Sequence, residues 1–197
     1  MGTKYQPDRQ GFNKRGLPEF SKVAEGVELI LQGMGYYIEG DLEKTPYRVA
    51  KAYMELCNNE PFELTEFETG DYDGIVFQGP IEFNSLCRHH ILPFTGNAWV
   101  AYLPNKKIVG LSKIARTVDY WSRGLQTQEY ITQNIANFLM DKLNPKGVAV
   151  RMTANHTCME LRGVKKRAPT TTQTVLGVFR KSPSTKQEFE NFVRDNQ

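Results

Sequence analysis

The 197-residue sequence has few cysteines, no long apolar run and almost no excess of charge of one sign. Its three cysteines cannot all pair with one another, which argues against a disulfide-stabilised secreted protein and favours reduced thiols. Because there is no run of about 18 apolar residues and no hydrophobic signal core at the N-terminus, we expect neither a membrane span nor export. The 25 basic and 22 acidic residues are interspersed, which disfavours a protein that coats nucleic acid. These absences predict a cytoplasmic protein with no nucleic-acid or membrane partner.

The residues that are present are typical of one folded domain with an appendage. Apolar residues make up 40% of the chain, which is enough for a hydrophobic core. Residues 1–20 are polar and contain prolines and glycines, so we predict a flexible arm there. Residues 21–74 are predicted to form an N-terminal helical region, and residues 75–197 the main domain with a short C-terminal helix.

Hydrophobic periodicity separates helices from strands along the chain. Apolar residues at helical spacing predict four helices, over residues 21–33, 45–57, 112–124 and 127–144. A last helix is expected to begin at Ser184 and Thr185, with Glu188 completing a capping box behind Thr185.

The pattern in the rest of the chain is that of short β-type segments separated by turns. They comprise residues 75–77, 81–83, 98–103, 108–110, 148–154 and 170–179. The acidic segment 63–73 is expected to be a loop. The order helices, strand, strand, helix, helix, strand, strand predicts an α+β fold, in which a helix pair covers one face of an antiparallel sheet.

Cysteine and histidine gather at two places, Cys87-Arg88-His89-His90 and His156-Thr157-Cys158. Thiolate and imidazole ligands in this layout suit a borderline-soft cation such as Zn²⁺. Three protein ligands, Cys87, His90 and Cys158, would leave one position open for catalysis, whereas a fourth ligand would make a closed structural site. The spacing of the residues is compatible with both.

Strand geometry adds two expectations about these segments. Residues an odd number apart cannot share a face of a strand, so the chain must turn between Cys87 and His90. In the downstream segment we expect a strand that places one polar set of side chains on a common face: His156, Cys158, Glu160 and Arg162.

Charged residues near the starts of the predicted helices have two possible meanings. Lys113 and Arg116 form one basic pair, and Arg48 and Lys51 form another. Cations in a first helical turn oppose the helix dipole unless an anion is bound, so each pair fits either a phosphate site or a solvated surface. Glu129 either stabilises the dipole of its helix or accepts two N–H donors from a guanine edge.

From about Leu42 to its end, the sequence resembles the GTP cyclohydrolase I family. The resemblance rests on six ordered blocks: KTPYRVAK (44–51), CRHH (87–90), GLSKIAR (110–116), LQTQE (125–129), HTCM (156–159) and LRGV (161–164). It implies the tunnelling fold, which is a four-stranded antiparallel sheet with two helices per subunit. It also implies assembly into a toroidal homo-oligomer, a decamer, with active sites between subunits.

The resemblance also implies a role for each matching residue. Zn²⁺ would be bound by Cys87, His90 and Cys158, with His89 and His156 left off the metal to transfer protons. Glu129 would hold the guanine ring, and Gln128 would also bind the substrate. The residues implied to bind the triphosphate are Ser112, Lys113, Arg116 and Arg162, with Arg48 and Lys51 from a neighbouring subunit.

The implied reaction is hydrolytic opening of the imidazole ring of GTP at C8. It releases formate and gives 7,8-dihydroneopterin triphosphate, from which folate, tetrahydrobiopterin and deazaguanine synthesis all begin. Arg88 stands where the family usually has glutamate, which changes the local charge by two units. This departure adds one alternative, an enzyme of the same fold with an altered purine nucleotide or pterin substrate. A separate alternative is a non-enzymatic oligomer that binds zinc or nucleotide.

Overall fold

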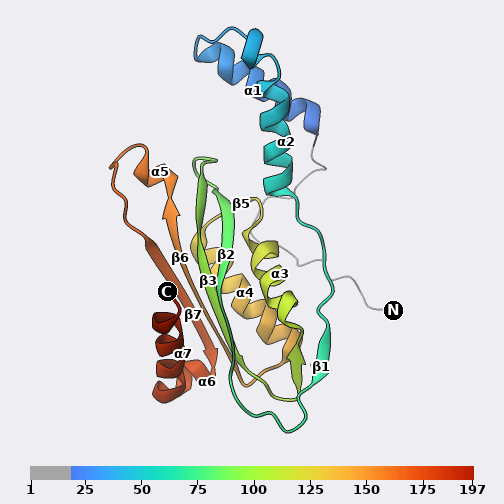
Figure 1. Cartoon of the computed structure of the whole chain (residues 1–197), viewed down its shortest axis with the longest axis vertical. Coiled ribbons are helices and arrows are strands. Elements are labelled where there is room, and N and C mark those ends of the chain that lie inside the picture. The colour runs from blue at the N-terminus through green and yellow to red at the C-terminus, as the bar shows by residue number, and fades with distance from the viewer. Residues whose placement is uncertain (1–18) are drawn as a thin grey trace. The chain divides into compact units, whose positions relative to one another are not determined.

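The computed structural model describes residues 19–197 (Figure 1). The expected flexible arm, residues 1–20, lies outside the described residues except for its last two, and Phe20 already begins a helix. The described chain forms two compact units, one ending at Asn59 and the other spanning Glu60–Gln197. None of the helices in residues 19–197 is long and apolar enough to span a bilayer.

The first unit is helical, as the apolar spacing predicted. It consists of α1 (Phe20–Gly33), the short 3₁₀ helix η1 (Gly40–Leu42) and α2 (Thr45–Cys57). Pro46 lies in the first turn of α2, where its missing N–H costs nothing. Among its described residues, Val27 and Leu31 of α1 and Pro46 and Ala50 of α2 are buried.

The second unit is built on a five-stranded sheet with the order β5-β2-β3-β6-β7. Its strands are β2 (Val76–Cys87), β3 (Pro93–Leu103), β5 (Leu125–Gln126), β6 (Gly147–His156) and β7 (Thr170–Gly177). The four long strands pair antiparallel, as predicted, and the two-residue β5 adds a parallel edge beside β2. The α+β class is therefore confirmed.

Two parts of the predicted strand pattern are wrong. The segments 75–77 and 81–83 are one strand, because β2 continues through a register shift between Gln78 and Ile81. The acidic segment predicted as a loop contains β1 (Glu66–Glu68), which pairs with β4 (Lys107–Val109). Its central residue Phe67 lies opposite Ile108, so a local acidic composition did not prevent pairing.

A helix pair covers one face of the sheet, as predicted. The helices are α3 (Leu111–Ser122) and α4 (Gln128–Leu143), and Thr127 caps α4 by accepting a hydrogen bond from the Tyr130 N–H. Their fully buried apolar side chains pack against alternate residues of β3 and β6. The central members of this core are Val100, Ile114, Val118, Ile131, Ile135, Val150 and Met152.

The opposite face of the sheet is covered by the C-terminal helices α6 (Val178–Lys181) and α7 (Pro183–Asp195) (Figure 1). Phe179, Phe189 and Val193 pack there against Trp99, Ala101 and Ala149, which alternate with the residues of the first core. The predicted start of the last helix is wrong. Ser182 is its cap and accepts a hydrogen bond from the Thr185 N–H, because Pro183 provides a preset first helical residue.

Candidate metal centre and its surroundings

A tight turn between β2 and β3 brings His90 beside Cys87. The Cys87 carbonyl accepts from the N–H groups of His90 (3.3 Å) and Ile91 (2.8 Å), while the Cys87 N–H donates to the Leu92 carbonyl (2.8 Å). Ile91 takes a left-handed backbone conformation, with φ of 58°. The turn required by the odd spacing of Cys87 and His90 is therefore confirmed.

The downstream segment differs from the sequence prediction. Strand β6 ends at His156, opposite Phe94, and residues Thr157–Glu160 form the helical turn α5. The Thr157 hydroxyl donates to the Pro93 carbonyl, which ties the start of this turn to β3. The prediction that His156, Cys158, Glu160 and Arg162 share one strand face is wrong, because the strand stops before Cys158.

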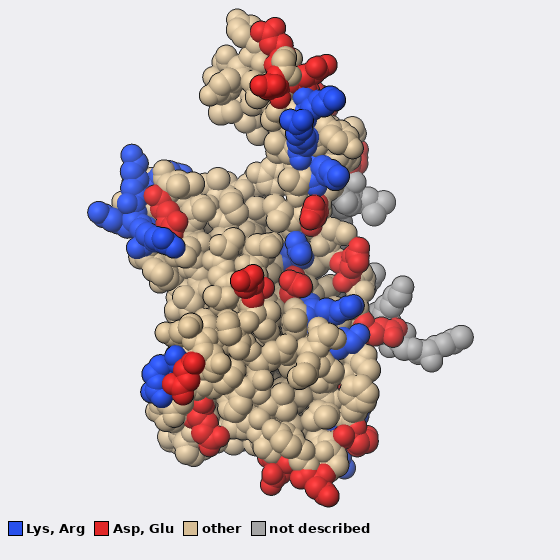
Figure 2. All heavy atoms as spheres, viewed as in Figure 1, with Lys and Arg blue, Asp and Glu red and all other residues tan. Residues whose placement is uncertain are grey.

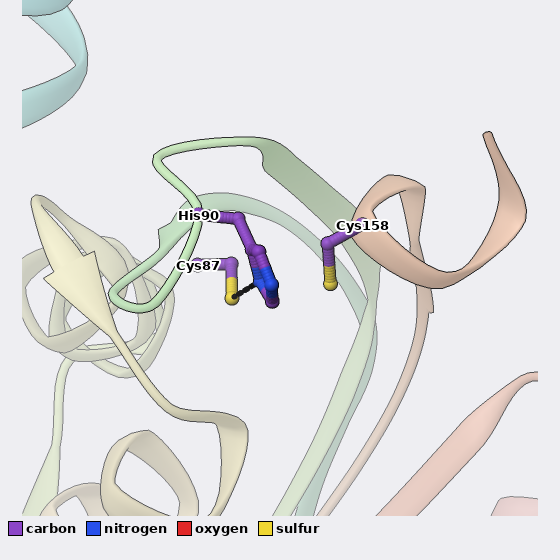
Figure 3. A group of neighbouring side chains, drawn as sticks. All are labelled: Cys87, His90 and Cys158. Carbon is purple, nitrogen blue, oxygen red and sulfur yellow. Dashed lines mark hydrogen bonds between the residues drawn. The ribbon is translucent and has the colours of Figure 1, made fainter. Parts of the chain in front are cut away.

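The turn and α5 together bring three ligand-type side chains toward one another (Figure 3). The ligand atoms of Cys87, His90 and Cys158 all lie within 4.8 Å of one another, and Cys87 Sγ is 3.7 Å from His90 Nδ1. Tetrahedral zinc, with bonds of about 2.3 Å to sulfur and 2.0 Å to nitrogen, holds such ligand atoms about 3.6 Å apart. The residues therefore fit a zinc ion bound by two sulfurs and one ring nitrogen.

The three residues are the only such group in the part of the chain that the structure describes. His89 lies close to it, with Nδ1 4.0 Å from Cys87 Sγ, and its side chain is exposed. His156 does not belong to the group, and its Nε2 atom is 2.9 Å from Gln128 Oε1. Three ligands leave a tetrahedral ion with one open position, which is the arrangement of catalytic zinc sites.

The surroundings of Cys158 change the ionisation of its thiol. Burial raises the pKa of Cys158, and the nearby Cys87 raises it further through charge and a hydrogen bond, while Arg162 acts in the opposite direction. Burial and the neighbouring Cys87 sulfur therefore favour the protonated form of Cys158 in the absence of a cation. A bound divalent cation would reverse this preference, because a coordinating thiol is deprotonated.

His156 is held by contacts on two sides. Its ring stacks on Phe94 with centroids 4.5 Å apart and an interplanar angle of 11°. Burial lowers the pKa of His156, and the carboxylates of Glu129 and Glu160 oppose this shift. The electrostatic effect of Glu129 places that carboxylate close to His156, as a shared site requires.

The Gln128 side chain is buried, with only 2% of its surface exposed. Its Nε2 donates to the carbonyls of Met152 (3.0 Å) and Thr170 (2.9 Å) and lies 3.1 Å from Thr172 Oγ1. Its Oε1 faces His156, as described above. The amide that was expected to bind substrate is thus surrounded by protein groups.

The basic candidate residues of the second unit lie in two regions. Arg162 follows α5 in an exposed connection that also carries Lys165, Lys166 and Arg167, and Figure 2 shows Lys and Arg side chains gathered there. The effect of Arg162 on Cys158 places this charge near the metal centre. Glu160 lies 3.9 Å from Arg167, so the connection is not purely positive.

Ser112, Lys113 and Arg116 lie in the first turns of α3, at the end remote from the metal centre. Gly124, just beyond the other end of α3, accepts a hydrogen bond from the Leu86 N–H next to Cys87. From Lys113 to the last residue of α3 the axis rises about 14 Å. Arg116 lies about 9 Å along the axis from the same end of α3.

The remaining candidates are exposed side chains. Glu129 lies in the first turn of α4, and Arg48 and Lys51 lie on α2 in the other unit. Arg88 is also exposed, and its backbone N–H donates to the Gln126 carbonyl (3.0 Å) of β5. The unusual charge at this position therefore projects from the surface of the turn.

Sequence reasoning did not single out Phe94 as a site residue. Phe94 reaches His156 because β3 and β6 pair in one particular register, which no local pattern encodes. The position of Phe94 directly after the Cys87–Leu92 turn is the only local signal for it. The internal partners of Gln128 were missed for the same reason, since they come from β6 and β7.

These observations define an α+β protein with an open three-ligand centre and a histidine beside it. The family model for GTP cyclohydrolase I matches residues 23–194. Three relatives are each called GTP cyclohydrolase 1: those of Sulfurihydrogenibium sp. (42% identical, covering 89% of this chain and 96% of the relative), Campylobacter jejuni (46%, 87% and 94%) and Chlorobium chlorochromatii (48%, 87% and 80%). The chain belongs to the GTP cyclohydrolase I family, and it is an enzyme of the cyclic amidine hydrolase type.

Proposed function

We propose that the protein is a zinc-dependent enzyme that opens the imidazole ring of GTP at C8, releases formate and forms 7,8-dihydroneopterin triphosphate. The observation that carries this proposal is the convergence of Cys87, His90 and Cys158, three ligands that leave one position open. The family to which the chain belongs supports the choice of GTP. We place the reaction in the cytoplasm, at the start of pterin biosynthesis, including that of tetrahydrofolate.

The three ligands would hold Zn²⁺, which supplies a Lewis acid that makes water available as a nucleophile at neutral pH. Cys87 and Cys158 provide two negative charges when deprotonated, and His90 provides a neutral ligand. The rigid turn at Cys87 and the tie from Thr157 to Pro93 set the position of these ligands before substrate binds.

Two histidines are proposed to move protons during ring opening. His156 is kept neutral by burial, so it can accept a proton at neutral pH. His89, exposed and close to Cys87, would be the second proton carrier. Breaking the C–N bonds of the imidazole ring requires several proton transfers, which explains a need for more than one such group.

The substrate would be held by its two ends. Glu129, close to His156, would accept the N–H donors of the guanine edge. The cationic groups Lys113, Arg116 and Arg162, with Ser112, would bind the triphosphate, together with Arg48 and Lys51 from a neighbouring subunit. Because Lys113 lies about 14 Å along α3 from the helix end near Cys87, we infer that the α3 basic pair serves the site of a neighbouring chain.

We therefore propose that the active site lies between subunits of a toroidal homo-oligomer, a decamer with the tunnelling fold. In such an assembly, the metal centre of one subunit would receive the α3 basic pair of a neighbour. Closed cyclic assemblies of this kind use one repeated heterologous interface, so every subunit can contribute to two equivalent sites.

Arg88 does not by itself require a different substrate. Its side chain is exposed on the β2–β3 turn, where solvent screens its charge. We propose that GTP remains the substrate and that Arg88→Glu leaves the preference for GTP over dGTP and other purine nucleotides unchanged. A changed preference would favour the alternative of a drifted substrate.

The test is turnover of GTP by zinc-loaded protein, followed by formate release and by the fluorescence of the oxidised pterin product. We expect one formate per pterin formed, loss of both signals on chelation, and recovery on addition of Zn²⁺. Protein with a full complement of zinc that releases no formate from GTP would overturn the proposal.

A further inference from the structure

The buried amide of Gln128 contacts His156 within a hydrogen-bond network from which the orientation of the amide can be assigned. Backbone carbonyls only accept hydrogen bonds, so the end of the amide that faces the Met152 and Thr170 carbonyls must be the NH₂ group. This fixes Gln128 Oε1 toward His156. Since an amide oxygen only accepts, the hydrogen in the 2.9 Å contact must be on His156 Nε2.

Two threonines complete the network around Gln128. Thr132 Oγ1 donates to the Gln128 backbone carbonyl at 2.7 Å, so its hydrogen is used there. In the 2.6 Å contact between the two hydroxyls, Thr172 must therefore be the donor. Thr172 Oγ1 lies 3.1 Å from Gln128 Nε2 and shares the two N–H hydrogens of the amide with the two backbone carbonyls, so the amide cannot rotate without breaking bonds to β6 and β7.

We propose that Gln128 is a positioning residue that locks the neutral imidazole of His156 in the Nε2–H tautomer. This inference rests on the proposed function for its catalytic meaning. The locked tautomer makes Nδ1 the proton-accepting atom of His156, and the Phe94 stack holds the plane of the ring. Gln128 thus acts on the reaction through His156 and makes no bond to the substrate.

The tautomer can be observed by ¹⁵N NMR of histidine side chains in the zinc-loaded protein. The chain has only three histidines, so the His156 signals can be assigned with a His156→Asn variant. We expect a protonated Nε2 and an unprotonated Nδ1 for neutral His156 in the unmodified protein. A protonated Nδ1 there would overturn the proposal, whether or not any variant folds and whether or not GTP turns over.

The test variant is Gln128→Met, which keeps the length of the side chain and removes its hydrogen bonds. We expect a mixture of His156 tautomers, a kcat for GTP that falls roughly 10- to 100-fold, as for other partners that orient a functional histidine, and a KM within about threefold of the original. The matched control is Thr172→Val, which disrupts the same buried network but leaves the contact between Gln128 and His156. It should lower stability and keep the single tautomer.

Each other outcome counts against the positioning role. An unchanged tautomer in Gln128→Met shows that Gln128 does not select it, and a mixed tautomer with unchanged kcat shows that the selection does not matter. A higher KM with unchanged kcat makes Gln128 a substrate ligand. If the unmodified protein lacks activity on GTP, the proposed function fails, and the NMR result still decides the tautomer.

Discussion

Phe94 and His156 face each other across β3 and β6, with parallel rings at 4.5 Å. Phe94 is almost fully buried and belongs to the core below the helix pair, whereas His156 is half-buried beside the metal centre. The contact joins the hydrophobic core to a side chain that we propose to be catalytic. It predicts that a core substitution at Phe94 has consequences for turnover.

Phe94→Leu should remove the flat surface on which His156 stacks. We expect a loss of about 1–2 kcal/mol in the free energy of unfolding, measured with urea, and a severalfold lower kcat. The control is Phe83→Leu, because Phe83 contacts the ring of Phe94 edge-on in the same core. It should destabilise the protein to a similar extent with kcat nearly unchanged, and equal effects on kcat would contradict a role for the stack.

Cys158→Ser should abolish stoichiometric zinc binding, because it leaves only two of the three ligands and removes one thiolate. Metal content after gel filtration in metal-free buffer would measure this loss. Cys57→Ser, a change in α2 outside the ligand group, is the control and should retain one zinc per chain. Zinc retained by Cys158→Ser would mean that the ion binds elsewhere.

Glu129→Gln should reduce recognition of guanine. A charged acceptor of two N–H groups would be lost. The loss of transition-state stabilisation should be about 1.5–3 kcal/mol, which lowers kcat/KM for GTP roughly 10- to 100-fold. Asp141→Asn removes an exposed carboxylate near the other end of α4 and serves as the control. If both variants keep normal kinetics, Glu129 only stabilises the dipole of its helix.

Mixed oligomers can test whether α3 and the metal centre come from different subunits. Lys113→Ala and Cys158→Ser chains, each inactive alone, should form active hybrids when co-expressed, reaching about a quarter of normal activity if they mix at random. The control pair is Cys87→Ser with Cys158→Ser, which damages the same centre in both chains and cannot complement. Absence of activity in the first pair, with hybrids shown by mass spectrometry, argues for a site within one chain.

Tyr102→Phe should destabilise the second unit through one buried hydrogen bond. The Tyr102 hydroxyl accepts from the Val109 N–H at 3.0 Å, and its loss should cost about 1–3 kcal/mol at neutral pH. Burial raises the pKa of Tyr102 above the ordinary 10.0, so the unfolded chain ionises first and this residue's contribution falls as the pH rises above 10. The difference between the two proteins in urea unfolding should therefore shrink in alkali. A difference that is constant up to pH 11 would contradict this.

The sequence patterns correctly predicted the helices, the cap and the turn that are determined by residues close together in the chain. The helices α1, α3 and α4 follow from apolar spacing, and the Thr127 cap and the turn after Cys87 follow from residue type and from the odd separation of Cys87 and His90. The ligand group was visible because it contains two of the three cysteines and one of the three histidines. These features depend on neighbours within a few positions along the chain.

The features that sequence reasoning missed depend on partners distant in sequence. Alternation suggested that the strand continues through Cys158, but the Thr157 hydroxyl bonds to Pro93 on β3 and a helical turn follows. Likewise, no residue near Gln128 in the sequence indicated that its amide donates to carbonyls of β6 and β7, two strands far along the chain. Residue type alone does not reveal which partners satisfy a buried amide.

The ligand group draws on two separate connections, the β2–β3 turn and α5 at the end of β6. An ion shared by Cys87, His90 and Cys158 would cross-link these two connections, which the hydrogen bond from Thr157 to Pro93 also ties together through β3. Its loss would loosen the rim formed by both connections while leaving the two hydrophobic cores intact. Such a chain would stay folded and soluble after demetallation, and the apoprotein could bind the ion again.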